Sequence, residues 1–274
     1  MKVDKNRLGH NFGRQAFRYD QYAQVQRYMA EQLVGYLQVL ERPPARILEI
    51  GCGTGYLTGL LRQTFPDAHL TALDLAPAAL AQARRRLGHD PWIDWLVADG
   101  EQPLRGRFDL ITSNSVFQWF NQPAESCRRY REHLHPGGGL IFATLGPATF
   151  QELALSLERA AQQLSLNGGG AISPPPIPAQ GFAGSAAWQQ FLVQAGFVGV
   201  KVHRQLWMES YPGVLAFLKA IRGMGATRPS PAALSRRLLT EMIASYEAGY
   251  RVNGTIPVTY ELLWALARHA LHSV

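Results

Sequence analysis

The chain has 274 residues, 47% of them hydrophobic and 17% charged, and its 27 Lys and Arg against 20 Asp and Glu give a net charge of +7. This composition is that of an ordinary globular protein and excludes collagen, coiled coil and wholesale disorder. No run approaches the roughly 18 apolar residues of a bilayer span, and the charged N-terminus lacks the apolar core of a secretory signal. Cys52 and Cys127 are too few for a disulfide framework and form no metal-site pattern. We therefore expect a cytoplasmic protein without a membrane span or a metal site.

The excess positive charge lies in short clusters, at 84–86, 128–131 and 236–237. Clusters of this kind are usually solvated, and near helix C-termini they interact favourably with the helix dipole. A basic surface also raises the encounter rate with an acidic partner, which could be a nucleic acid or an acidic carrier protein. Composition alone does not choose between these interpretations.

The first half of the chain alternates strands with helices. Apolar spacing near 3.6 residues predicts a helix over 12–40, ended by Pro43 and Pro44. Buried-type strands are then predicted at 47–48, 69–74, 93–98, within 108–120 and at 138–145, with helices that begin near Tyr56, end at Leu87 before Gly88, and cover 124–134. This alternation predicts βαβ units and a parallel sheet with right-handed crossovers.

The second half of the chain lacks this regular alternation and contains a Gly/Pro-rich segment. We expect helices over 149–164 and 186–195, a Gly/Pro-rich loop or flap over 167–181, an edge strand over 197–208, a helical stretch over 212–239 broken at 223–231, and a last strand over 256–268. Together these elements predict an α/β fold, with a doubly wound, mostly parallel seven-stranded sheet of Rossmann-like type.

The strongest local signal is the run Glu49–Gly55 (EIGCGTG), between a predicted strand and the helix that begins near Tyr56. Closely spaced glycines let the backbone approach a ligand, because no side chain fills the space. Asp74 ends the next strand about 20 residues on, where a carboxylate can bind a ribose diol. No Lys-Ser or Lys-Thr pair follows, which argues against a phosphate-binding P-loop. The alternative is a tight turn without a ligand.

Two further strand ends carry polar side chains. Asp99 and Gly100 follow the third strand, where the carboxylate can accept a hydrogen bond from an adenine amino group; the alternative is a turn cap. Asn114 ends the fourth strand, close to Phe117 and Trp119, which can equally be core residues. Since the carboxyl ends of parallel strands form the ligand crevice of an open α/β sheet, we expect these side chains in one site.

On these residues, the segment 46–145 resembles the class I S-adenosyl-L-methionine-dependent methyltransferases. LEIGCGTG is similar to their glycine motif, and FDLITSNSVFQW and LHPGGGLIFATL are similar to their fourth and fifth strands. The resemblance implies S-adenosyl-L-methionine as cofactor, with S-adenosyl-L-homocysteine as its product. The residues that it assigns to the cofactor are Tyr19, Gly51, Cys52, Gly53, Asp74, Leu75, Asp99, Gly100 and Asn114.

The whole chain is similar to a narrower family, the malonyl-acyl-carrier-protein O-methyltransferases of biotin synthesis. The motifs that carry this similarity are FGR at 12–14 with Tyr19, NSVFQW at 114–119, FATL at 142–145, LKAIRGMGAT at 218–227 and PVTY at 257–260. Two features depart from the pattern: the loop 167–181 is long and proline-rich, and Arg222 stands where a lysine is usual. The similarity implies methylation of the free carboxylate of a malonyl thioester, held by an acidic acyl carrier protein or by coenzyme A, with neither nucleic acid nor membrane as partner.

The resemblance also suggests how one domain over 1–274 is divided. We expect a helical lid over 1–42, the cofactor-binding core over 43–145, a second half over 146–208, a helical insertion over 209–252 and the last strand over 253–274. In the lid, Phe12 and Tyr19 are seven residues apart and therefore share one helical face. The alternative is that Tyr19 simply packs against the sheet.

Methyl transfer from a sulfonium to a carboxylate needs positioning more than acid-base chemistry, since the nucleophile is already ionised at pH 7. We therefore predict no catalytic His/Asp/Ser set, and assign the catalytic roles to Tyr19 and to Arg222, whose guanidinium would grip the acceptor carboxylate. For Arg222 the alternative is a solvated helix arginine. For the chain, the alternatives are methylation of a free acid or of a secondary-metabolite hydroxyl, and a non-catalytic module that only binds the cofactor.

Overall fold

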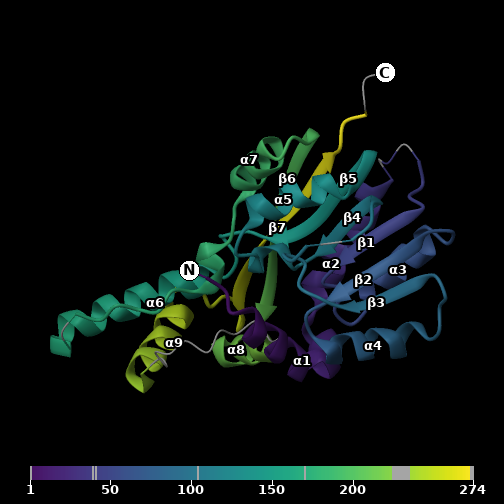
Figure 1. Ribbon diagram of the computed structural model, residues 1–274. Helices are drawn as coiled ribbons and strands as arrows, with labels where there is room; N and C mark the ends of the chain where they lie inside the picture. The colour runs from purple at the N-terminus through teal and green to yellow at the C-terminus, as the bar shows by residue number, and fades with distance from the viewer. Residues whose placement is uncertain are drawn as a thin grey trace.

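The computed structural model describes residues 2–38, 40, 42–103, 105–169, 171–223 and 235–271. Within these ranges seven strands form one sheet in the spatial order β3-β2-β1-β4-β5-β7-β6 (Figure 1). The strands are β1 (Arg46–Ile50), β2 (His69–Asp74), β3 (Ile93–Val97), β4 (Phe108–Asn114), β5 (Leu134–Leu145), β6 (Val198–Tyr211) and β7 (Ile256–Arg268). The predicted seven-stranded, mostly parallel sheet is confirmed.

The strand order fixes where a ligand can bind. β1 to β5 are parallel, and β7 lies antiparallel between β5 and β6. The chain moves outward from β1 through β2 to β3 and then returns to β4 on the other side of β1. The carboxyl ends of β1 and β4 therefore flank the switch point of the sheet, which is where open α/β sheets form their ligand crevice.

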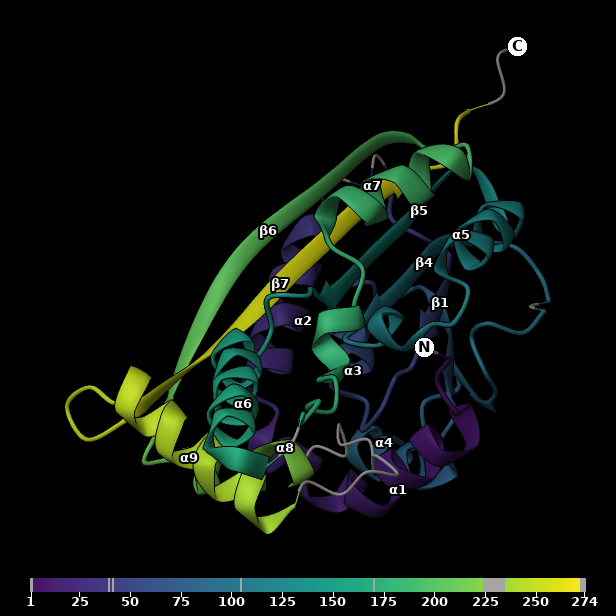
Figure 2. The ribbon, with the colours of Figure 1, turned by 90° about the vertical axis from the view of Figure 1, so that its left-hand side faces the viewer.

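Helices cover both faces of the sheet (Figure 2). The α-helices within the described residues are α1 (Lys5–Tyr22), α2 (Gln24–Leu37), α3 (Tyr56–Thr64), α4 (Pro77–Leu87), α5 (Pro123–Glu132), α6 (Gln151–Leu164), α7 (Ser185–Gln194), α8 (Val214–Gly223) and α9 (Arg236–Tyr250). Apolar side chains of α2, α3 and α4 pack into one buried cluster, and those of α5 and α7 pack into a second cluster on strand residues. Two helical layers thus enclose the sheet, as the doubly wound prediction requires.

The N-terminal helix differs from its prediction. Instead of one helix over 12–40, α1 begins at Lys5 and α2 ends at Leu37, with a break at Ala23. The Asp4 side chain caps α1 by accepting a hydrogen bond from the Arg7 backbone N–H. The two helices on either side of the break have different contacts. α2 buries its apolar stripe against the sheet, whereas α1 contacts α4 and α8 at the carboxyl edge of the strands.

The second half of the chain follows its prediction with two main corrections. β6 is an edge strand whose burial alternates, and β7 runs over 256–268 as predicted. α6 begins at Gln151, two residues late, because Phe150 has a left-handed backbone with φ of 62°. α9 continues to Tyr250 rather than ending at Leu239. Its later turns are held by the buried side chains of Met242 and Tyr246, and the helix packs against α6. None of the helices described is long and apolar enough to span a membrane.

Candidate active site

A cavity lies at the carboxyl edge of the strands, beside the switch point between β1 and β4. The empty space within it amounts to about 790 Å³, part of which is open to solvent. We call it the main cavity. Its lining from the sheet side comprises Ile50, Gly51, Gly53, Thr54, Leu73, Asp74, Leu75, Ala79, Ala98, Asp99, Gly100, Asn114, Ser115, Val116, Trp119 and Phe120. Most of the predicted cofactor residues therefore meet at one place.

The three glycines of the loop after β1 serve different purposes. A Cβ on Gly51 would lie 2.2 Å from Val116 Cγ2, and a Cβ on Gly55 would lie 2.9 Å from Ala83 Cβ, so these two positions are closed by packing. Gly53 has φ of 54° and no atom within 4 Å of the position of a Cβ. The predicted close approach of backbone to ligand therefore applies to Gly53, while Gly51 and Gly55 allow the loop to pack.

Asp74 holds the glycine loop in place. Its Oδ2 accepts a hydrogen bond of 2.9 Å from the Gly53 N–H, and its Oδ1 accepts one of 2.7 Å from the Ala76 N–H. Burial raises the pKa of Asp74, and the two backbone donors oppose that shift by stabilising the charged form. The carboxylate thus both lines the main cavity and orders the loop.

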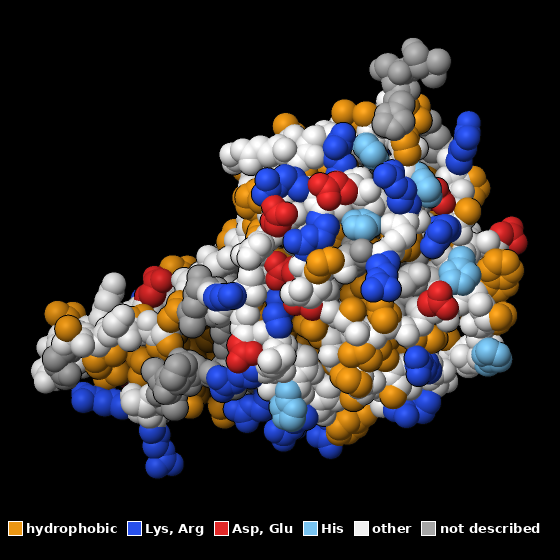
Figure 3. Space-filling view, viewed as in Figure 1, with side chains coloured by type: hydrophobic (Ala, Val, Ile, Leu, Met, Phe, Trp, Pro, Cys, Tyr) orange, Lys and Arg blue, Asp and Glu red, His pale blue; other side chains and the backbone are white. Residues whose placement is uncertain are grey.

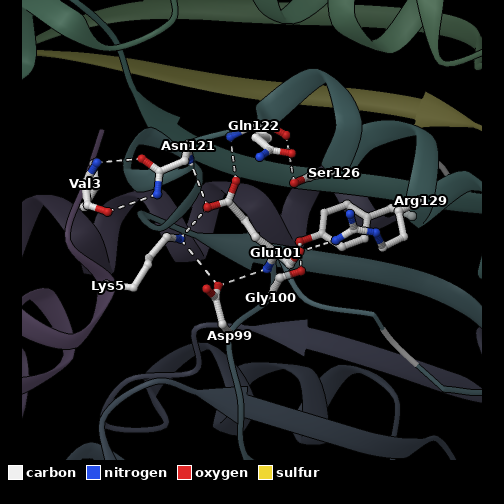
Figure 4. Close-up of polar contacts among 10 residues, drawn as sticks. Val3, Lys5, Asp99, Gly100, Glu101, Asn121, Gln122, Ser126 and Arg129 are labelled. Carbon is white, nitrogen blue, oxygen red and sulfur yellow. Dashed lines mark hydrogen bonds and ion pairs between the residues drawn. The ribbon is translucent and has the colours of Figure 1, made fainter. Parts of the chain in front are cut away.

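The predicted adenine partner, Asp99, takes part in a polar cluster (Figure 4), and both Asp99 and its neighbour Lys5 line the main cavity. Its Oδ1 accepts a hydrogen bond of 3.0 Å from the Glu101 N–H, which is the turn cap considered as the alternative. The same oxygen lies 3.4 Å from Lys5 Nζ, which also forms an ion pair of 2.7 Å with Glu101 Oε2. Asp99 therefore combines the turn cap with a position on the cavity wall.

The start of the chain is fastened to the sheet by this cluster, which we call the N-terminal latch (Val3, Lys5, Glu101 and Asn121). The Val3 N–H donates to Asn121 Oδ1 over 2.6 Å, and Asn121 Nδ2 donates to the Val3 carbonyl over 3.0 Å. Glu101 in turn accepts hydrogen bonds from the backbone N–H groups of Asn121 and Gln122. The latch joins Val3 to Asn121, 118 positions away, and Lys5 to Glu101, and so holds the start of α1 against the sheet.

α1 closes the main cavity from outside the sheet. Its inward-facing residues Lys5, Leu8, Gly9, Phe12, Ala16 and Tyr19 line the cavity. The Phe12 ring contacts the rings of Tyr19 and Trp119 edge to face, with centroids 6.4 and 6.3 Å apart. At the other end of the helix, Asp20 accepts hydrogen bonds from Thr54 Oγ1 and Arg86 Nη2. The shared face predicted for Phe12 and Tyr19 is confirmed.

A second, smaller cavity lies behind the glycine loop, and we call it the inner cavity. It shares part of its wall with the main cavity, namely Tyr19, Gly51, Gly53, Thr54 and Asn114. The rest of its lining is Asp20, Ala23, Gln26, Arg27, Glu49, Cys52, Tyr56 and Leu57. Four of its buried polar atoms have no hydrogen-bond partner: Gln26 Oε1, Glu49 Oε2, Asn114 Oδ1 and Arg27 Nε. Such atoms are costly to bury alone, so the inner cavity can accept polar groups of water or of a ligand as their hydrogen-bond partners.

Glu49 is the most perturbed carboxyl group of the site. Its side chain is buried, and burial raises its pKa to about 8; the nearby Thr58 hydroxyl opposes this shift, and the charge of Asp74 adds to it. At neutral pH the carboxyl group is therefore largely protonated in the ligand-free protein. A cation bound beside Glu49 would favour its ionised form.

Glu49 should make the ligand-free protein less stable as the pH rises. The folded state keeps this proton up to about pH 8, whereas the unfolded chain loses it near the ordinary value of 4.5, so the free energy of unfolding falls across this window. Glu49→Gln removes the titration, and the slope should become less steep by up to about 1.4 kcal/mol per pH unit. Urea denaturation from pH 5 to 9 measures it, with the exposed Glu132→Gln as matched control. Equal slopes for Glu49→Gln and wild type would contradict the assignment.

The predicted site residues do not all meet. Cys52 is buried on the wall of the inner cavity, Leu75 lies against Gly9 of α1, and Tyr19 faces both cavities. Burial raises the pKa of Tyr19, so its hydroxyl keeps its proton. Arg222 is the exception: its side chain is exposed in the last turn of α8, and neither cavity is lined by it. Residues 224–227 of the motif that follows lie outside the described part of the chain.

Several site residues were not found from the sequence. Lys5, Gln26 and Arg27 come from helices whose polar residues look like ordinary solvent-facing side chains. Glu49 carried a signal, because it opens the glycine motif, but nothing in the pattern shows that its oxygen is left unpartnered. No residue that lines either cavity is a histidine, and the described residues hold no cluster of His, Cys, Asp or Glu that could bind a metal ion.

Comparison with known proteins places the chain among methyltransferases. Residues 48–140 match the family described as Methyltransferase domain. The chain is 35% identical to the malonyl-[acyl-carrier protein] O-methyltransferase of Halalkalibacterium halodurans, with 98% of this chain and 100% of the relative covered. It is 36% identical to the protein of the same name from Brevibacillus brevis, with 97% and 96% covered.

Solved structures share the fold at lower identity. The YcgJ protein of Bacillus subtilis matches with a TM-score of 0.58 and 15% identity, over 88% of this chain and 99% of that one. Phosphoethanolamine N-methyltransferase 2 of Haemonchus contortus, solved with S-adenosyl-L-methionine, matches with a TM-score of 0.57 and 15% identity, over 93% and 56%. The sequence relatives are more specific, because they are similar over nearly their full length. The chain belongs to the malonyl-acyl-carrier-protein O-methyltransferase family.

Proposed function

We propose that this protein transfers a methyl group from S-adenosyl-L-methionine to the free carboxylate of a malonyl thioester carried by an acyl carrier protein. The product would be the malonyl methyl ester that starts pimeloyl formation in biotin synthesis. The observation that carries the proposal is the set of unpartnered polar atoms beside the glycine loop, in a chain of this family. These atoms match the charged end of the cofactor.

The inner cavity suits the methionine part of S-adenosyl-L-methionine. Its α-ammonium group can donate to the unpartnered oxygens of Glu49, Asn114 and Gln26, and its carboxylate can accept from Arg27 Nε. An ammonium group beside Glu49 would also stabilise the ionised carboxylate that burial disfavours. Each buried group that costs free energy alone would then have a partner of opposite character.

The main cavity suits the adenosine part. Asp74 is the ribose partner, as proposed from the end of β2, while Asp99 and the backbone of Gly100 stand where the adenine amino group is expected. Apolar side chains supply the remaining wall, among them Leu75, Val116 and Trp119. Tyr19 lies where the two cavities join, so its protonated hydroxyl can donate a hydrogen bond close to the transferred methyl group.

When bound, the cofactor supplies an electrophilic methyl group on a sulfonium. The acceptor carboxylate is ionised at neutral pH, so the proposed reaction needs no general base. The two opposite charges neutralise each other as the methyl group moves. The role of α1 and the aromatic cluster of Phe12, Tyr19 and Trp119 is therefore to exclude water and to hold the reactants in line.

The residue that holds the acceptor carboxylate stays a prediction. We predict Arg222 for this role; its side chain is exposed at the end of α8. A hydroxyl acceptor, which is the alternative, would need a base to remove its proton. The acid-base side chains among the described lining residues of the main cavity are Lys5, Asp74, Asp99 and the protonated Tyr19, and histidine, the most common general base, is not among them.

A transfer assay tests the proposed function. Methyl-labelled S-adenosyl-L-methionine is incubated with the protein and with malonyl carrier protein, malonyl-CoA or a panel of free acids and alcohols. Acetyl carrier protein is the matched control, since it differs only by lacking the free carboxylate. Label on malonyl carrier protein and none on the acetyl form is the expected result. Label only on a free acid or a hydroxyl would replace the acceptor, and binding without transfer to any of them would make the protein a binding module.

A further inference from the structure

The outer face of α1 is basic along its whole length. Residues 7, 14 and 18 are exposed arginines that recur at helical spacing, and Phe17 stands among them with 62% of its surface exposed. The opposite face of the same helix lines the main cavity. Arg18 lies over the Phe17 ring, 5.2 Å from its centroid, so charge and apolar surface are presented together.

α8 continues this surface beside α1. Leu215, Lys219 and Arg222 recur at intervals of four and three residues, which places them on one helical face, and all three are exposed. Leu215 has 66% of its surface exposed. The helices touch where Gly223 meets the Tyr22 ring, since a Cβ on that glycine would lie 2.5 Å from Tyr22 Cε2. Figure 3 shows Lys and Arg side chains gathered along the edge of the molecule formed by α8, α1 and α4.

This surface carries little negative charge to neutralise it. The two acidic residues of the N-terminal helix region are occupied elsewhere: Asp4 caps the helix, and Asp20 binds Arg86 and Thr54. From residue 210 to residue 240 the sequence has five basic residues and no Asp or Glu. Within the described residues, Arg7, Arg14, Arg18, Lys219 and Arg222 form no ion pair with a carboxylate. An unneutralised basic face attracts an acidic partner.

We propose that the outer faces of α1 and α8 form the docking surface for the carrier protein, and that an acidic, amphipathic helix of the carrier binds there. Its carboxylates would pair with Arg14, Arg18 and Lys219, and its apolar residues would cover Phe17 and Leu215. This inference rests on the proposed function and adds the surface that recognises the partner. Because the other side of α1 walls the main cavity, a carrier bound on this face stands next to the site that its thioester must enter.

The test compares two substrates that share the malonyl thioester. Malonyl carrier protein offers the docking helix, whereas malonyl-pantetheine has the same reacting group without the protein. For Arg18→Glu/Lys219→Glu we expect kcat/KM to fall at least tenfold on the carrier substrate, mainly through KM, and to stay unchanged on malonyl-pantetheine. Phe17→Ser should lower kcat/KM on malonyl carrier protein severalfold. Salt should slow the wild type on the carrier substrate more steeply than the double variant.

The matched control places the same charge change at the opposite edge of the sheet. Arg105 and Arg107 are exposed and precede β4, and Gly106 between them lies against the side chain of Arg46 at the start of β1. Arg105→Glu/Arg107→Glu should leave both substrates unaffected. Circular dichroism checks that each variant is folded.

The outcomes separate the docking surface from the proposed function. Unchanged kcat/KM of Arg18→Glu/Lys219→Glu on the carrier substrate overturns the docking surface while leaving the function intact. An equal loss on both substrates also overturns it, because these residues would then act at the reacting group. If the wild type is inactive on malonyl carrier protein, the proposed function fails and the docking surface fails with it. Arg222→Ala distinguishes its two possible roles in the same way, since a carboxylate clamp would affect both substrates.

Discussion

Deletion of residues 1–20 should abolish methyl transfer and leave a folded protein. The deletion removes the wall of the main cavity that α1 supplies, including Phe12, Ala16 and Tyr19. It also removes Val3 and Lys5 of the N-terminal latch. The strands and α2 to α9 keep their own buried clusters, in which residues before Val25 take only a small part. We expect kcat/KM to fall by at least about 100-fold, equivalent to roughly 2.7 kcal/mol of transition-state stabilisation.

A single substitution in the latch tests the same idea without shortening the chain. Lys5→Met keeps the length of the side chain but removes both of its ion pairs, with Asp99 and Glu101. These pairs are largely buried, so we expect a loss of activity smaller than that of the deletion and an unchanged circular dichroism spectrum. If the truncated protein is folded and turns over at the wild-type rate, α1 is not a lid. If the truncated protein does not fold, Lys5→Met becomes the test. Full activity of Lys5→Met would exclude a role of the latch in methyl transfer.

Asp74→Ala should weaken cofactor binding by about 2 kcal/mol, or roughly thirtyfold in Kd, because charge-assisted hydrogen bonds are each worth about 1.5–3 kcal/mol. Two effects add. The ribose loses its partner, and the N–H groups of Gly53 and Ala76 lose the acceptor that holds the glycine loop. Asp74→Asn is the matched control: it keeps the size of the side chain and one oxygen, so its loss should be smaller. Titration calorimetry with S-adenosyl-L-methionine measures both variants, and wild-type affinity in Asp74→Ala would remove Asp74 from the site.

The sequence predicted those parts of the fold that depend on local patterns. β2 and β7 have the predicted bounds, because a turn signal at Ala76 and Pro77 follows β2, and because β7 is rich in β-branched and aromatic residues. The break at Ala23 carries no such signal, since neither Gly nor Pro stands there. The break is needed because α2 packs against the sheet, whereas α1 packs across the carboxyl edge of the strands. Both sets of contacts join residues that are far apart in the chain.

The candidate site was predictable to the same extent. Asp74, Asp99 and Asn114 stand at strand ends, and parallel strands bring such ends together whatever the rest of the chain does. The lid contacts depend on pairs such as Val3 with Asn121, which are 118 positions apart. Glu49 Oε2 accepts no hydrogen bond from the described residues, and a sequence motif does not show which donors surround a side chain.

One measurement tests the central claim, that the methyl group goes to the carboxylate oxygen of a carrier-bound malonyl group. The protein is given methyl-labelled S-adenosyl-L-methionine and malonyl carrier protein, and the labelled product is then fully hydrolysed in strong alkali, which cleaves the thioester as well as a methyl ester. A methyl ester releases its label as volatile methanol, so we expect the label to be recovered in the distillate. Label that stays bound to carbon after this treatment, or a malonyl carrier that takes up no label, would contradict the account.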